Sequence, residues 1–229
     1  MPPLLTAATR KELNAAVPEL AEECLPEHVV VPVRVRGRPW LACVTGVGPI
    51  NAATAMGLAL ARHPDISGVL NMGLAGTFDA DVAPLGATVL ITEEIWPEYG
   101  LADATGVDAE GLGFPLWEEG SQRVWDRLPV SATPRALGLN IPPGTIHGAS
   151  LTVAGVTNSP ERAARLRGRY RALTENMEGF AVALACARQN VPLVEVRTIS
   201  NRVGSRAPAD RNFGAALAQL DAALAALFL

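Results

Sequence analysis

Residues 40–62 are WLACVTGVGPINAATAMGLALAR, and they hold a predicted strand, a glycine turn and a helix in direct succession. Residues 40–45 are a short, mostly apolar run of the kind that forms a buried strand. Glycine and proline between positions 46 and 49 end that run, and the alanine-rich residues 51–62 then fit a helix. A strand that leads through a tight turn into a helix is a building unit of α/β folds.

Short apolar runs and helical patterns alternate through much of the chain. The predicted strands cover residues 3–7, 29–35, 40–45, 67–72, 88–92, 145–152 and 193–200. The predicted helices cover residues 10–20, 51–62, 160–170, 177–190 and a last apolar stripe at 213–227. We therefore predict that residues 1–229 form a single three-layer α/β domain, with a mixed central β-sheet flanked by helices.

Residues 94–134 interrupt this alternation. They contain Trp96, Trp117 and Trp125 together with many glycines, prolines and acidic residues. Long loops in compact domains tend to carry function, so we predict an irregular insertion here.

The amino-acid composition limits which kinds of partner and which cellular compartment we expect for this chain. A formal net charge of -4, without a basic tract interleaved with aromatic residues, argues against a nucleic-acid partner. No apolar run is long enough to span a membrane, and the first residues lack the order of a signal peptide. Cys24, Cys43 and Cys186 show no C-x-x-C spacing and are typical of reduced thiols. We expect a cytoplasmic protein that binds neither membrane nor nucleic acid.

Two glycine-containing segments, 46–51 and 71–77, each follow a predicted strand. Glycines such as Gly48 let backbone N–H groups approach a ligand closely. The first segment is not a dinucleotide fingerprint, because Asn51 stands where the third glycine would be. Two such loops at one edge of a parallel sheet form a ligand crevice, although turn geometry alone would also explain them.

Residues 175–179, ENMEG, place Glu178 at the start of an apolar helix. A buried carboxylate is costly unless it is hydrogen bonded, and the vicinal hydroxyls of a ribose are suitable donors. Alternatively, Glu178 is an N-terminal acid that the helix dipole favours.

Residues 196–204, VRTISNRVG, end a buried strand at Ser200 and Asn201. The Asn201 amide offers both a donor and an acceptor, which suits the N7 and O6 edge of a 6-oxopurine. An asparagine that caps the strand turn would fit the same pattern.

Taken in order, these segments resemble the purine nucleoside phosphorylase/nucleosidase superfamily over nearly the whole chain. Within it, E-N-M-E-G-x-A and S-N-x-V-G-x-R are similar to the futalosine hydrolases of the menaquinone pathway. The resemblance implies a nucleoside phosphorylase-like fold and a purine nucleoside as the small-molecule ligand. It implies hydrolysis of the N-glycosidic bond of futalosine, which releases hypoxanthine and dehypoxanthine futalosine. It implies no metal and no cofactor, and a homo-oligomer of two or more chains.

Carried onto this chain, the resemblance implies three catalytic residues: Glu178 for the ribose hydroxyls, Asn201 for the purine, and Glu12 as the base that activates water. The implied substrate-binding residues are Met177, Gly73, Leu74, Leu151, Thr152, Gly48 and Arg206. Of these, Met177, Gly73 and Leu74 would lie on the sugar side, Leu151 and Thr152 would match the base-stacking strand, and Arg206 would meet a substrate carboxylate. The water-activating glutamate of relatives aligns with Lys11, one residue before Glu12, and Glu12 also fits a capping box with Thr9.

Several functions stay open at this point. Neither 46–51 nor 71–77 contains the arginine with which a phosphorylase would hold phosphate, so water is the favoured nucleophile. A methylthioadenosine/adenosylhomocysteine-type nucleosidase would have Asp at the position of Asn201. A purine nucleoside phosphorylase and a catalytically silent purine-nucleoside-binding protein are also compatible with these motifs.

Overall fold

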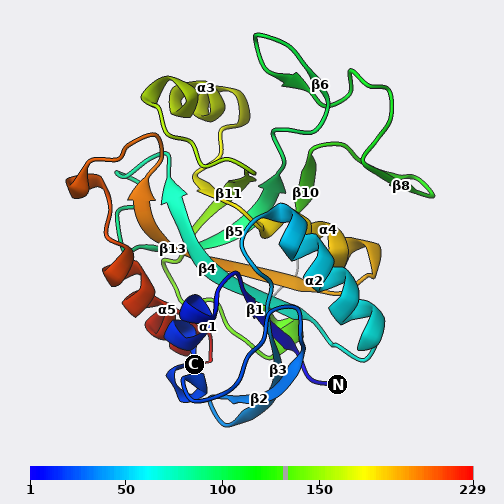
Figure 1. The fold of residues 1–229 in the computed structure, drawn as a ribbon, viewed down its shortest axis with the longest axis vertical. Helices are drawn as coiled ribbons and strands as arrows, with labels where there is room; N and C mark the ends of the chain where they lie inside the picture. The colour runs from blue at the N-terminus through cyan, green and yellow to red at the C-terminus, as the bar shows by residue number, and fades with distance from the viewer. Residues whose placement is uncertain (131–133, 229) are drawn as a thin grey trace.

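A mixed β-sheet forms the centre of the computed structural model, which describes residues 1–130 and 134–228 (Figure 1). Within these residues the sheet contains β1 (Leu4–Ala7), β2 (Val31–Val35), β3 (Arg38–Val44), β4 (Val69–Thr77), β5 (Thr88–Ile95), β10 (Arg127–Pro129), β11 (Ile146–Thr152), β12 (Thr174–Asn176) and β13 (Leu193–Arg202). Their order is β10-β5-β11-β12-β4-β1-β3-β2, and β13 pairs with both β4 and β5. β13 runs parallel to β4 and antiparallel to β5, so the sheet is mixed, as predicted.

Helices cover both faces of the sheet. They are α1 (Arg10–Ala16), α2 (Pro49–Arg62), α3 (Pro160–Tyr170), α4 (Gly179–Arg188) and α5 (Phe213–Leu227). The short 3₁₀ turns are η1 (Pro18–Leu20), η2 (Pro134–Leu137) and η3 (Pro208–Asp210). Figure 1 shows α2 beside α4 on one side of the sheet and α1 beside α5 on the other. Met56 and Phe180 belong to the core cluster under the first pair, and Leu13 and Leu220 to the cluster under the second, which confirms the three-layer α/β architecture.

The first helix is shorter than the sequence pattern predicts. α1 ends at Ala16, and Pro18 begins η1 instead of extending the predicted helix to residue 20. A proline inside a helix removes a backbone donor and clashes with the preceding turn. The predicted capping box is present: the Thr9 hydroxyl accepts from Glu12 N, and the Glu12 carboxylate accepts from Thr9 N.

Residues 71–77 are a strand, and the prediction of a loop was wrong. They belong to β4, which pairs with β13 along its length and with β12 at Gly76 and Thr77. Glycine is common in turns, but here backbone partners on both sides hold the segment extended. The three-residue β12, which the sequence did not predict, is one of these partners.

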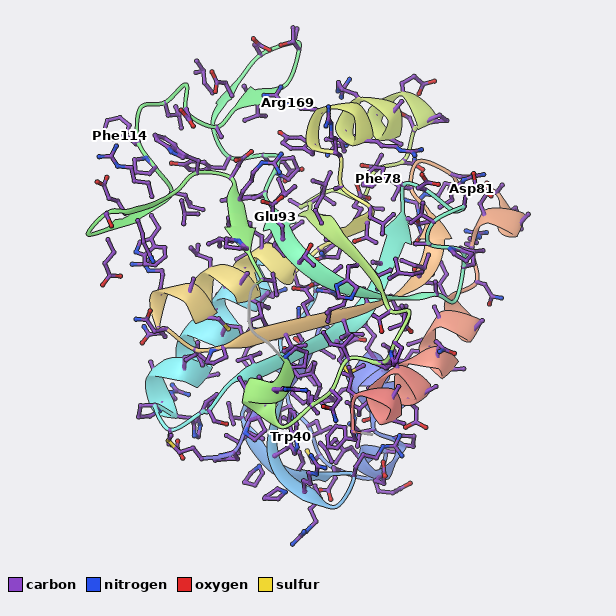
Figure 2. The ribbon with its side chains drawn as sticks, turned by 180° about the vertical axis from the view of Figure 1, so that it is seen from behind. Trp40, Phe78, Asp81, Glu93, Phe114 and Arg169 are labelled. Atoms are coloured by element: carbon purple, nitrogen blue, oxygen red, sulfur yellow. The ribbon has the colours of Figure 1, made fainter. Side chains whose placement is uncertain are left out.

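Residues between β5 and β10 leave the sheet and form hairpins. β6 (Leu101–Ala102) pairs with β7 (Val107–Asp108), and β8 (Trp117–Glu119) pairs with β9 (Gln122–Val124). In Figure 1 these strands project beyond the helical layers. Figure 2 shows Phe114 at their outer end and Arg169 of α3 close to them, and Arg169 donates a hydrogen bond to the Val107 carbonyl. The stretch predicted as irregular therefore has local strand pairing, and within it β10 rejoins the main sheet. Residues 131–133 of the predicted stretch lie outside the described residues.

Candidate active site

A cavity of about 390 Å³ lies where β4 and β13 approach the start of α4. Five residues singled out from the sequence line it: Glu12, Leu74, Met177, Glu178 and Asn201. They come from α1, β4, the turn before α4 and the end of β13, so the fold brings together segments that are far apart in the chain.

Glu178 is the N-cap residue of α4, but its side chain makes no capping hydrogen bond. Its Oε1 accepts the backbone N–H of Gly48 at 2.9 Å, and its Oε2 lies 3.6 Å from Nη1 of Arg197. Gly48 has φ 91°, a left-handed conformation that favours glycine and directs this N–H toward the carboxylate. Burial raises the pKa of Glu178, against the opposing effects of Arg197 and the Gly48 N–H. Gly48 therefore acts through Glu178, and it does not itself line the cavity.

Glu12 combines a structural contact with a place in the cavity. Its Oε2 accepts from the Thr9 hydroxyl at 2.7 Å, and its Oε1 accepts the backbone N–H of Leu74 at 3.0 Å. These hydrogen bonds hold both carboxylate oxygens in place. Only 9% of the residue is exposed. Glu12 thus forms the capping box and lines the cavity at the same time. Lys11, by contrast, is exposed and lies at the cavity rim.

Asn201 follows an irregularity in β13. The pairing with β4 shifts between Ile199 and Asn201, so that Ile199 faces Ala75 and Asn201 faces Gly76. Such a bulge turns the following side chain relative to the regular alternation of a strand. The Asn201 Oδ1 accepts from the Ser200 hydroxyl at 2.9 Å, while its Nδ2 makes a 3.3 Å contact with the Arg202 carbonyl. The amide is partly exposed to the cavity and keeps hydrogen-bonding capacity for a ligand.

Arg197 is a site residue that the sequence patterns above did not single out. Its side chain is 1% exposed, with Nε 2.8 Å from Glu195 Oε1 and Nη2 3.4 Å from Asn176 Oδ1. A Cβ on Gly73 would lie 2.7 Å from Nη1 of Arg197 and 3.0 Å from Oε1 of Glu12. The absence of a side chain at Gly73 thus leaves room for both the guanidinium of Arg197 and the carboxylate of Glu12.

The sequence held a signal for this group. Glu195 and Arg197 stand two residues apart and alternate with apolar residues in the first half of β13, so both side chains leave the same face. Charged residues are seldom fully buried unless they are paired. An alternating Glu–Arg pair inside a buried strand therefore indicates an internal ion pair.

Glu94 is a further buried carboxyl group, next to the Glu195–Arg197 pair. Glu94 accepts hydrogen bonds from the Thr152 hydroxyl at 2.6 Å and from Nδ2 of Asn176 at 2.7 Å. Burial raises the pKa of Glu94 well above its ordinary value, and the negative charge of Glu195 raises that pKa further. When Glu94 carries a proton it is neutral. The guanidinium of Arg197 then balances the negative charge of fewer buried carboxylates.

A glutamate beneath a glycine loop, an asparagine at a strand bulge and a second glutamate on the first helix now lie around one cavity. The family model of the phosphorylase superfamily matches residues 4–229. The chain belongs to this superfamily. It is 35% identical to a futalosine hydrolase of Thermus thermophilus over 177 residues, which cover 75% of this chain and 73% of that protein. It is 36% identical to a futalosine hydrolase of Streptomyces coelicolor, with 82% of this chain and 78% of that protein covered.

These identities place the chain in the futalosine hydrolase family of nucleosidases, within the phosphorylase superfamily. Among solved structures, a futalosine hydrolase mutant of Helicobacter pylori has a TM-score of 0.75 at 17% identity, with 99% of this chain and 98% of that chain covered. At that identity the likeness concerns the fold, which is the nucleoside phosphorylase fold expected from the motifs.

Five residues implied by the family resemblance do not line the cavity: Gly48 and Gly73, described above, and Leu151, Thr152 and Arg206. Leu151 is fully buried beside Ile95 and Tyr170 in a separate core cluster. Thr152 is also fully buried, and its hydroxyl accepts from Phe180 N at the start of α4 while it donates to Glu94. Arg206 is exposed and donates from Nε to Oδ1 of Asn158 at 2.7 Å. The structure thus gives Thr152 a supporting position and lends no support to a direct substrate contact by Leu151, Thr152 or Arg206.

Four apolar side chains form a wall of the cavity against which a base or an apolar tail can pack. Val156, Phe213 and Leu217 line the cavity together with Val47. Val156 stands a few residues beyond the predicted stacking pair, after β11 has ended. The offset arises because the chain must leave the core strand before a side chain can reach the cavity.

Proposed function

We propose that this chain hydrolyses the N-glycosidic bond of futalosine and releases hypoxanthine and dehypoxanthine futalosine, a step of menaquinone biosynthesis. The observation that carries the proposal is that Asn201 lines the same cavity as Glu12 and Glu178. The family membership supports the same reaction, since both curated relatives named above are futalosine hydrolases.

Each of the three side chains has a role that matches its surroundings. Glycosidic cleavage passes through an oxocarbenium-like sugar, which requires a nucleophile and stabilisation of positive charge. Glu178 accepts hydrogen bonds from the 2′- and 3′-hydroxyls and stabilises positive charge on the ribose. Glu12, held by Thr9 and Leu74 N, accepts a proton from the attacking water.

The leaving base takes up the electron pair of the broken C–N bond. Asn201 donates from its Nδ2 to the purine and so stabilises the negative charge that develops there. An amide donor suits O6 of hypoxanthine, whereas the amino group of adenine offers no acceptor at that position. This preference distinguishes the proposed activity from that of an adenosine-type nucleosidase.

The remaining site residues support these three. Met177 lines the cavity next to Glu178 and packs against the sugar, with Leu74 on the same side. Gly48 orients Glu178 through its N–H. Gly73 leaves room for Arg197 and Glu12, and no metal or cofactor enters the proposed reaction.

Release of free base tests the proposal. Futalosine, inosine and methylthioadenosine are each incubated with the chain, with and without phosphate, and the products are separated by chromatography. Hypoxanthine from futalosine at a rate independent of phosphate is the expected result. Adenine release indicates an adenosine-type nucleosidase, strict phosphate dependence a phosphorylase, and tight binding without turnover a silent binding protein.

We also propose that the chain assembles as a homo-oligomer through the outer face of α2. Residues 49–61 of this helix contain no charged side chain. Ile50 is 81% exposed and Leu58 37% exposed on the face turned away from the sheet. Light scattering should give a dimer or larger assembly, and Ile50→Glu should shift it toward the monomer. A monomeric native chain would refute this assignment.

We also propose a cellular compartment for the chain. Cys24, Cys43 and Cys186 are all free, and burial raises the pKa of the Cys43 thiol to about 11. Thiols of this kind suit the reducing cytoplasm, where we propose that the chain acts. Across residues 1–130 and 134–228, no helix combines the length and apolarity that a membrane crossing requires.

A further inference from the structure

Lys11 is the only lysine of the chain, and it lies at the rim of the cavity. Its side chain is exposed, and within the described residues it makes no ion pair or hydrogen bond. The neighbouring Arg10, by contrast, donates from Nη2 to the Glu23 carbonyl at 2.7 Å and does not line the cavity. The cavity thus has one cationic side chain in its lining, and that cation is free to meet a ligand.

The rest of the rim is apolar and unusually exposed. Phe213 is 48% exposed, Val47 50% and Val156 42%, and all three line the same cavity as Lys11. An aromatic ring and two aliphatic side chains offer contact area to the apolar body of a ligand. A lysine beside them offers a mobile point charge on a flexible stem. Together they suit an extension that is apolar along its length and anionic at its end.

Charge inside the cavity determines where such an anion can lie. Glu12, Glu175 and Glu178 line its inner part, and any of them that is ionised repels a second carboxylate. Lys11 is the opposite charge available at the edge. A nucleoside with an acidic tail therefore binds with its sugar inward and its acid outward.

We propose that Lys11 binds the carboxylate at the end of the substrate's 5′ tail, while Phe213 and Val47 contact the aromatic ring of that tail. This inference rests on the proposed function, because futalosine is a nucleoside whose 5′ extension carries an aromatic ring and a carboxylate. It makes Lys11 a specificity-determining residue. A nucleoside with a short neutral 5′ group gains nothing from this lysine.

The test compares two substrates and three enzymes. Futalosine and its methyl ester, which lacks the negative charge, are assayed with the native chain, Lys11→Met and Lys11→Arg. We expect the native chain to favour futalosine over the ester by roughly fivefold in kcat/KM, the upper range for an exposed ion pair. Lys11→Met should abolish that preference through a higher KM for futalosine at unchanged kcat, and Lys11→Arg should largely restore it.

The controls separate this inference from the reaction itself. Arg10→Met removes a neighbouring exposed cation outside the cavity and should keep the native preference. If the native chain releases no hypoxanthine from futalosine, the proposed function fails. If it does so but treats the acid and the ester alike, only the role of Lys11 fails. Loss of the preference in Arg206→Met and not in Lys11→Met would likewise overturn it.

A second measurement needs no variant. Reductive methylation with ¹³C-formaldehyde labels Lys11 and the N-terminal amine alone, and it keeps the charge of the lysine. The Lys11 dimethylamine resonance should shift on addition of dehypoxanthine futalosine, which carries the tail, and should stay in place with inosine. No shift with the tailed compound, or an equal shift with both, contradicts the proposal.

Discussion

Gly73 lies against both the buried guanidinium of Arg197 and the carboxylate of Glu12, so Gly73→Ala is a direct perturbation of the site. The added Cβ would lie 2.7 Å from Nη1 of Arg197, about 0.8 Å closer than an ordinary contact of about 3.5 Å. It would also lie 3.0 Å from Oε1 of Glu12. Arg197 cannot retreat easily, because Glu195 holds it at 2.8 Å in a fully buried position.

The expected effect on activity is much larger than the effect on stability. A displacement of about 1 Å in a positioned catalytic group can cost about a hundredfold, and the clash acts on Glu12 and, through Arg197, on Glu178. We therefore expect kcat for futalosine to fall by about thirty- to a hundredfold. Overpacking of this kind costs about 1–3 kcal/mol of folding free energy, which should leave the variant folded at 25 °C.

Base release and thermal unfolding are measured in parallel on Gly73→Ala and on a matched control, Gly168→Ala. A Cβ on Gly168 meets nothing within 4 Å, so this change in α3 should leave kcat unaltered and raise stability by up to about 1 kcal/mol. If Gly73→Ala keeps kcat within about threefold of the native value while folded, the native placement of Arg197 and Glu12 is not needed for the reaction.

Two further changes examine the base-binding end of the cavity and the buried carboxyl group. Asn201→Ala should lower kcat by about a hundredfold or more at unchanged thermal stability, since one preorganised donor to the leaving group is removed; a loss below tenfold in base release would refute that role. The raised pKa of Glu94 means that the folded state binds its proton more tightly than the unfolded state, so stability is lost as pH rises from the ordinary carboxyl range toward the folded pKa. Glu94→Gln removes this loss, and its melting temperature relative to the native chain should rise between pH 5 and pH 8, whereas a constant difference would show that folding does not change how tightly Glu94 binds its proton.

Much of the architecture follows from local patterns in the sequence. The strand, turn and helix of residues 40–62 reappear as β3, the Gly48 turn and α2, because apolar runs and glycine positions are local properties of the chain. Glu178 could be singled out since a carboxylate before an apolar helix is costly without a partner. Its pairing with Gly48 and Arg197 could not be predicted, since these residues are distant from Glu178 in sequence and become its neighbours only in the fold.

The errors have the same origin. Residues 71–77 contain two glycines that favour a turn, and only pairing with β12 and β13 shows that they are extended. The assignment of Leu151 to the base-binding wall assumed that β11 reaches the cavity. In the structure Leu151 lies in a core cluster, and Val156 lies at the cavity wall instead. Residue type alone does not tell where a strand leaves the core.

The charges of the site explain how one cavity can serve both ends of the proposed substrate. Glu12 and Glu178 both line the cavity, and Arg197, which lies 3.6 Å from Glu178, is already paired with Glu195. A fully buried arginine with this many acidic neighbours stabilises the carboxylates more than it offers a free positive charge to a ligand. The inner cavity is therefore suited to a cation and not to an anion such as phosphate, which also favours water as the nucleophile. The carboxylate of an acidic tail must then bind a cation outside this region. Lys11 at the rim is the cation in the cavity lining that is free to bind it.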